Sequence, residues 1–108
     1  MVLKKIVAIL VTDKLQDVEL RLRKIGVGGI TVTQCKGYGE YESFAGSGWS
    51  LPHVRIEIYC AAERADIIAE AIVEETHTGA TGDGIVAIQP VEQLYRIRTK
   101  TEALPSEI

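Results

Sequence analysis

The sequence predicts an α+β fold in which a strand, a helix and a strand occur twice in succession. Residues 3–12 form a hydrophobic run rich in β-branched side chains, and residues 53–61 alternate between hydrophobic and polar side chains. Each of these two strands is followed by a segment with the helical spacing of hydrophobic residues. Two such βαβ halves give an antiparallel sheet with both helices on one face, which is the ferredoxin-like βαββαβ sandwich.

The first strand is expected to be central in the sheet. Its two faces are both hydrophobic, with Ile6, Ala8 and Leu10 on one side and Val7, Ile9 and Val11 on the other. We expect both faces to be buried. The two helices can cover only one face of the sheet. We therefore expect the other hydrophobic face to be buried against another subunit in an oligomer.

The first helix is expected to begin at Asp13, which has the position of an N-cap, with Gln16 as its capping-box partner. Gly26 is expected to end the helix, and a strand follows over residues 30–37. The buried stripe of this helix is predicted to be Leu15, Val18, Leu22 and Ile25.

The second half begins after a long segment with little periodicity, residues 38–52, which contains Gly39, Gly46, Gly48 and Pro52. Loops of this length inside a domain are usually functional. The elements expected after it are a strand at 53–61, a helix at 63–76, a strand at 85–88 that Pro90 breaks, and a strand-like segment at 94–99. The chain is therefore predicted to be one domain, residues 1–101, with a regulatory loop at about 39–52 and a flexible tail at 102–108.

The composition excludes several classes of function. A net charge of −3 over 108 residues argues against nucleic acid as a partner, because binding the phosphate backbone needs a strong basic patch. No hydrophobic run approaches the ~20 residues that span a bilayer, and the N-terminus has no signal peptide, so a cytoplasmic location is expected. Cys35 and Cys60 are expected to be reduced thiols.

A glycine-rich segment, Thr78–Gly84, is the strongest indication of a ligand site. Its three glycines allow a tight bend that exposes consecutive N–H groups, which suits a phosphate. Arg96 and Arg98 follow at i and i+2, and on a strand that spacing places both guanidinium groups on one face. Together the loop and the arginines predict a nucleotide-phosphate site.

Several segments resemble PII signalling proteins, in the same order and with the same spacing outside one loop. The segments are 14–18, 25–33, 36–39, 51–57, the Thr-Gly-x-x-Gly-Asp-Gly motif at 78–84 and Arg-Ile-Arg-Thr at 96–99. The resemblance covers residues 3–102. It implies a non-enzymatic regulatory protein, a homotrimer that holds adenine nucleotide in the clefts between its subunits.

The resemblance also implies roles for individual residues. The adenine and ribose side of the cleft would be lined by Thr31, Gly37, Tyr38 and Gly39, with Glu57 and Tyr59 from the third strand. Gly82, Asp83 and Gly84 would hold phosphate through backbone N–H groups. Arg96 and Arg98 of the neighbouring chain would close the phosphate site.

The chain departs from the family pattern where the family binds triphosphate and metal. Tyr41 stands where the family has a glutamine that holds Mg²⁺, and Ala80, Ile85 and His53 stand where the family has lysines. We therefore expect ADP or AMP to be favoured over ATP. No cofactor and no metal site are expected.

The loop is shorter than in most of the family, and short-loop relatives are associated with carboxysomes and bicarbonate transport. The chain lacks the C-terminal cysteine pair of some transporter-associated members, which favours the carboxysome-associated type. The implied partners are an unidentified protein target, such as a bicarbonate transporter or a carboxysome component, and bicarbonate itself. The loop residues expected to contact a partner or bicarbonate are Glu40, Tyr41, Phe44, Ser47 and Trp49.

No enzyme signature is found: the sequence has no nucleophile–base motif, no metal triad and no Walker loop. Two alternatives to the carbon-linked regulator stay open. One is a structural or metal-tolerance trimer resembling CutA, which would need neither the glycine loop nor the arginine pair. The other is the nitrogen-regulatory function of PII proteins.

Overall fold

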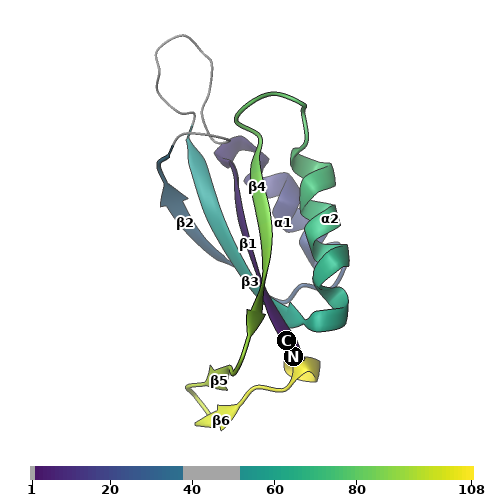
Figure 1. Ribbon diagram of the computed structural model, residues 1–108, viewed down its shortest axis with the longest axis vertical. Coiled ribbons are helices and arrows are strands. Elements are labelled where there is room, and N and C mark those ends of the chain that lie inside the picture. Colours follow the sequence, from purple (N-terminus) through teal and green to yellow (C-terminus); the bar gives the residue numbers. More distant parts are fainter. Residues whose placement is uncertain (1, 38–51) are drawn as a thin grey trace.

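The computed structural model describes residues 2–37 and 52–108. It contains a four-stranded antiparallel sheet in the order β2-β3-β1-β4, and α1 and α2 pack on one face of it (Figure 1). The elements are β1 (Leu3–Val11), α1 (Leu15–Lys24), β2 (Thr31–Cys35), β3 (His53–Ala61), α2 (Ala65–Thr76) and β4 (Gly84–Val91). This arrangement confirms the predicted ferredoxin-like fold.

The core lies between the sheet and the two helices. Every second residue of β1 and β3 points into it, and for β3 this is the face that the alternation of hydrophobic and polar side chains predicted. The largest fully buried side chains are Ile6, Leu10, Leu22, Ile56, Ile58, Ile68, Ile72 and Val18. The predicted helix stripe is therefore confirmed, with Leu15 and Ile25 packed at its ends.

The opposite face of the sheet is only half-buried. Val7, Ile9 and Val11 have intermediate exposure, so the burial expected for this face of β1 would need another subunit and stays a prediction. No helix of the described residues packs on this side (Figure 1). The hydrophobic side chains on this face of the sheet could become buried by contact with another subunit.

The helices begin differently from the prediction. A 3₁₀ turn, Thr12–Lys14, precedes α1, and no side chain caps either the turn or the helix, so Asp13 is not an N-cap. The other end behaves as expected. Gly26 has φ +91°, and the N–H of Val27 donates to the Leu22 carbonyl at 2.9 Å, which is the Schellman ending that favours glycine.

Two predictions near the C-terminus are also corrected. β4 continues through Pro90, because β4 is an edge strand and an edge position tolerates the missing N–H. Residues 94–99 do not form one strand: Tyr95–Arg96 (β5) pairs with Thr101–Glu102 (β6) across a turn at 97–100. Arg98 lies in that turn, so the two arginines do not share a strand face.

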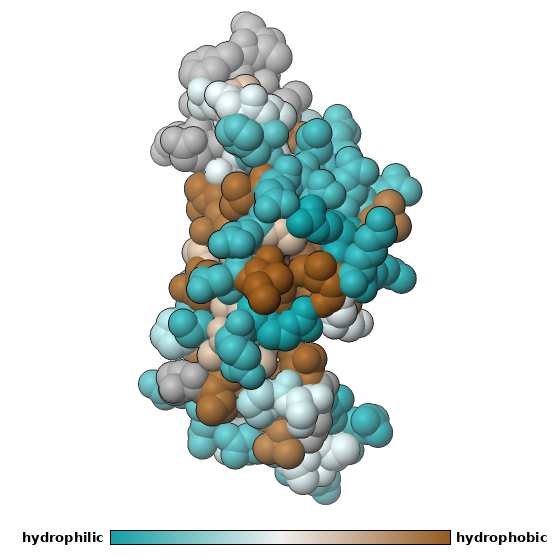
Figure 2. Space-filling view, turned by 90° about the vertical axis from the view of Figure 1, so that its right-hand side faces the viewer, coloured by the Kyte–Doolittle hydropathy of each residue, from teal (hydrophilic) through white to brown (hydrophobic). Residues whose placement is uncertain are grey.

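Beyond β6, a 3₁₀ turn covers Pro105–Glu107, and Ala103 is buried, with its N–H bonded to the Leu94 carbonyl at 2.8 Å. The side of the molecule formed by α2 is largely hydrophilic, with hydrophobic groups toward its middle (Figure 2). Exposed hydrophobic side chains on α2 and β4 include Ile67, Val73, Ile85 and Ile88. Among the described residues, no helix has the length and hydrophobicity needed to cross a bilayer.

Candidate functional site

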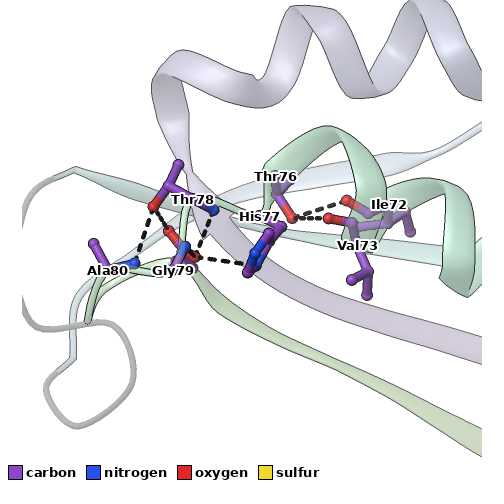
Figure 3. A network of polar contacts seen from close by, with 8 residues as sticks. Ile72, Val73, Thr76, His77, Thr78, Gly79 and Ala80 are labelled. Carbon is purple, nitrogen blue, oxygen red and sulfur yellow. Dashed lines mark hydrogen bonds and ion pairs between the residues drawn. The ribbon is translucent and has the colours of Figure 1, made fainter.

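The glycine-rich loop between α2 and β4 is folded around the carboxylate of Asp83. This carboxylate accepts hydrogen bonds from the backbone N–H of Thr78 at 2.8 Å, from the N–H of Gly79 at 2.9 Å and from the Thr78 hydroxyl. The Thr78 hydroxyl oxygen in turn accepts the N–H of Ala80 at 3.2 Å (Figure 3). The N–H groups at the start of the loop are therefore satisfied internally.

The tip of the loop, at Thr81, is exposed. Gly79 and Gly82 both have positive φ, +87° and +104°, which L side chains rarely adopt. Within the described residues, the exposed Thr81 donates no backbone hydrogen bond, the carbonyl of the buried Gly82 accepts one from His53, and the N–H of Asp83 has a long bond of 3.3 Å to the Ala80 carbonyl. Exposed N–H groups in a turn of this kind can bind an anion, and a phosphate site here stays a prediction.

His53 holds the loop from below. It is 3% exposed, and its Nε2 lies 2.8 Å from the carbonyl oxygen of Gly82, to which the ring N–H donates. His53, at the start of β3, therefore positions the glycine loop from inside the fold. His77 is different, because its exposed ring lies at the end of α2 with Nδ1 3.9 Å from a carboxylate oxygen of Asp83.

The environment of Asp83 makes the loop sensitive to acid. Burial is the largest single influence and raises the pKa of Asp83. The hydrogen bonds from Thr78 and Gly79, together with His77, outweigh it and hold the pKa below its ordinary value of 3.8. Because the folded pKa is lower than the unfolded one, the carboxylate stabilises the loop above about pH 4, and this contribution is lost as the pH falls through the lowered pKa.

We predict that the amide proton shifts of Thr78 and Gly79 titrate together, with a midpoint below the ordinary aspartate value. NMR titration of the folded chain measures this. In Asp83→Asn the same amides should lose the transition. A midpoint at or above the ordinary value would show that these hydrogen bonds do not stabilise the charged carboxylate.

A second region lies toward the other end of the sheet, where a cavity of about 510 Å³ opens between the α1–β2 connection, β3 and the C-terminal hairpin. Of the predicted residues, it is lined by Thr31, Glu57, Tyr59 and Arg96. Its apolar wall includes Ile30, Ile58, Ile68 and Leu94. A cavity of this size, with apolar walls and a few polar groups, has the character of a small-ligand site.

Glu57 is already paired at the edge of this cavity. Its carboxylate lies 2.5 Å from Nζ of Lys5 and 3.6 Å from the guanidinium of Arg55, and the Lys5 ammonium lies 5.8 Å from the centre of the Tyr59 ring. The hydrogen bond from Lys5 lowers the pKa of Glu57 and raises that of Lys5. Both groups are therefore charged at neutral pH, and Glu57 is an ion-paired acceptor.

Two residues of this region were missed by the sequence analysis, Lys5 and Arg64. Lys5 lies opposite Tyr59 in the β1–β3 register, and strand alternation already placed it on the side of Val7 and Ile9. Antiparallel pairing of the two strands would therefore have indicated its contact with Glu57. Arg64 lines the cavity and donates to the Ile25 carbonyl at the end of α1, and no local sequence pattern signals that contact.

The glycine loop and Arg96 lie at opposite ends of one chain. The loop is at the top of Figure 1, beside the start of β3, and β5 and β6 are at the bottom. A single chain thus brings Thr31, Glu57, Tyr59 and Arg96 together at one end and Gly82, Asp83 and Gly84 at the other. Arg98 is exposed in the turn between β5 and β6.

The remaining predicted residues are placed as follows. Gly37 follows β2 and is half-buried. The other ligand or partner residues lie outside the described residues: Tyr38, Gly39, Glu40, Tyr41, Phe44, Ser47 and Trp49. Among residues 2–37 and 52–108, no group of at least three His, Cys, Asp or Glu side chains is arranged to hold a metal ion.

The chain thus combines a ferredoxin-like fold with a glycine-rich loop closed on Asp83 and a separate cavity at the other end of the sheet. Residues 3–101 match the family described as "Nitrogen regulatory protein P-II". The chain belongs to this PII family, whose members are regulatory proteins that bind adenine nucleotides and form trimers.

Relatives from several organisms carry the same name, "Nitrogen regulatory protein P-II". The protein of Cereibacter sphaeroides is 40% identical over 104 residues, covering 90% of this chain and 93% of the relative. That of Rhizobium meliloti (strain 1021) is 39% identical over the same length and coverage. That of Pasteurella multocida (strain Pm70) is 39% identical over 107 residues, covering 93% and 96%. The family prediction is thus confirmed, and the carboxysome-associated subtype stays a prediction.

Proposed function

We propose that this chain is a regulatory protein that binds an adenine nucleotide between two subunits of a homotrimer. The separation of the two site regions within one chain carries the proposal. The exposed tip of the glycine loop would bind phosphate, and Arg96 lines the cavity at the far end of the sheet. Two neighbouring subunits would each supply one half, and the half-buried open sheet face would be the contact between subunits.

We further propose that ADP or AMP is preferred over ATP. The exposed tip of the loop carries no cation, and no lysine or arginine occurs between Thr78 and Tyr95. A triphosphate brings additional charge that needs cations or Mg²⁺ to offset its desolvation. Arg96 and Arg98 from a neighbour would suffice for one or two phosphates.

The relatives' names favour nitrogen regulation as the pathway over the inorganic-carbon role expected from the short loop. The family match also favours a PII regulator over the CutA-like metal-tolerance alternative. We therefore propose a signalling role in nitrogen regulation as the function to test first. The protein target would be contacted through the loop at about 39–52. Bicarbonate is included among the ligands to be titrated, because the inorganic-carbon role is the alternative.

Calorimetry of the purified chain with AMP, ADP and ATP, each with and without Mg²⁺, tests the proposal. We expect ADP or AMP to bind at least as tightly as ATP, with no gain from Mg²⁺. ATP binding tenfold tighter than ADP would contradict the preference, and the absence of binding by every nucleotide would contradict the function. Light scattering should give the mass of a trimer. A bicarbonate titration distinguishes the nitrogen-regulatory role from the inorganic-carbon role, because only the latter expects bicarbonate to bind.

A further inference from the structure

The glycine loop contains an anion of its own. The carboxylate of Asp83 is held by the N–H groups of Thr78 and Gly79 and by the Thr78 hydroxyl, within the same loop whose tip, at Thr81, is exposed. A phosphate bound at the tip would therefore lie within a few residues of a fixed negative charge. This charge is part of the loop's architecture, because three donors converge on it.

Few cations in the same chain offset that charge. Among the described residues, His77 at 3.9 Å is the group within ion-pair distance of the Asp83 carboxylate, and its exposed imidazole is charged only when protonated. The loop itself carries Ala80, and the strand that leaves it begins with Gly84 and Ile85. His53, the basic residue beneath the loop, is engaged with the Gly82 carbonyl.

We propose that Asp83 is a specificity-determining residue that limits how much phosphate charge the loop accepts. The inference rests on the proposed nucleotide function and deepens it. Each phosphate added to AMP places further negative charge near the Asp83 carboxylate, and the repulsion between them rises with every addition. AMP meets this repulsion least and ATP most, so the carboxylate orders the affinities by phosphate number.

A purely structural role for Asp83 predicts a different result. If the carboxylate only closed the loop, its removal would weaken all three nucleotides by the same factor. Thr78→Val separates the two roles, because it removes one hydrogen bond to the carboxylate and leaves the charge in place. This variant should weaken AMP, ADP and ATP evenly and leave their ratio unchanged.

Calorimetry with AMP, ADP and ATP on the trimeric chain tests the proposal with Asp83→Asn and Asp83→Ala. The alanine variant removes the charge without turning an amide N–H toward the donors of Thr78 and Gly79. In both variants we expect the ratio of ATP to AMP affinity to rise about three- to tenfold, given a loop exposed to water and salt. Asp66→Asn is the matched control, because it removes an exposed carboxylate at the opposite end of α2 and should leave the ratio unchanged.

An unchanged ATP to AMP ratio in both Asp83 variants, beside measurable binding by the unmodified chain, would overturn this inference and leave the proposed function standing. An equal rise in Asp66→Asn would also overturn it, since net charge would then explain the effect. If the unmodified chain binds none of the three nucleotides, the proposed function fails and this inference falls with it.

Discussion

Gly84→Ala is expected to prevent the chain from folding stably. Gly84 begins β4 with φ +113°, and a Cβ added there would lie 1.8 Å from the carbonyl oxygen of Ile9 and 2.8 Å from its carbonyl carbon. Both atoms belong to the backbone of β1, the central strand, so no side-chain rotation can relieve the clash. We expect a loss above about 4 kcal/mol in the free energy of unfolding, measured by urea denaturation or as a loss of folded protein.

Two other glycines provide controls for this substitution. Gly79→Ala has open space around its Cβ but a φ of +87°, so it isolates the cost of the left-handed backbone, about 1–2 kcal/mol. Gly29→Ala has open space and no such φ, and it should change stability by less than about 0.5 kcal/mol. A Gly84→Ala chain as stable as Gly29→Ala would show that β4 does not approach β1 as described.

The regular elements could be predicted because their signals are local. The alternation in residues 53–61 gave β3 with its observed bounds, and the helical stripe gave the buried face of α1. The helix starts were missed because 3₁₀ turns, Thr12–Lys14 and Ala62–Arg64, replace side-chain caps. The strand through Pro90 was missed because its edge position depends on the order of strands in the sheet, which is a tertiary property.

The site was predicted in parts for the same reason. The glycines and the aspartate of the loop are adjacent in sequence, so their composition indicated a phosphate nest. The hydrogen bonds from Thr78 and Gly79 to the Asp83 carboxylate depend on how the loop closes, which the sequence does not indicate. Arg96 and Arg98 were placed on one strand face because only their i and i+2 spacing was considered. The pairing of Tyr95–Arg96 with Thr101–Glu102 instead sends Arg98 into the turn. The separation of the glycine loop from the arginines within one chain is set by the tertiary fold, so no local sequence pattern could have predicted it.

The double variant Arg96→Ala/Arg98→Ala should weaken nucleotide binding about tenfold or more without unfolding the chain. Arg98 is exposed and Arg96 lies in a short hairpin outside the main sheet, so their removal spares the core. A hydrogen bond to a charged group contributes roughly 1.5–3 kcal/mol, which is about one to two decades in affinity. Calorimetry with ADP measures the loss, and thermal unfolding checks that the fold is kept.

Complementation between two defective chains then decides whether each site is shared between subunits. Thr81→Asp places a carboxylate at the exposed tip of the loop and should abolish phosphate binding from the loop's side while leaving the core intact. Neither this chain nor the double arginine variant should bind ADP tightly alone. When the two chains are refolded together in equal amounts, they assort at random into trimers. Roughly one site in four then combines an intact loop from one subunit with intact arginines from its neighbour. ADP binding at normal affinity should therefore return in about that fraction of sites. If the loop and the arginines of the same chain formed the site, no mixture could restore it, because every chain in the mixture carries one defect.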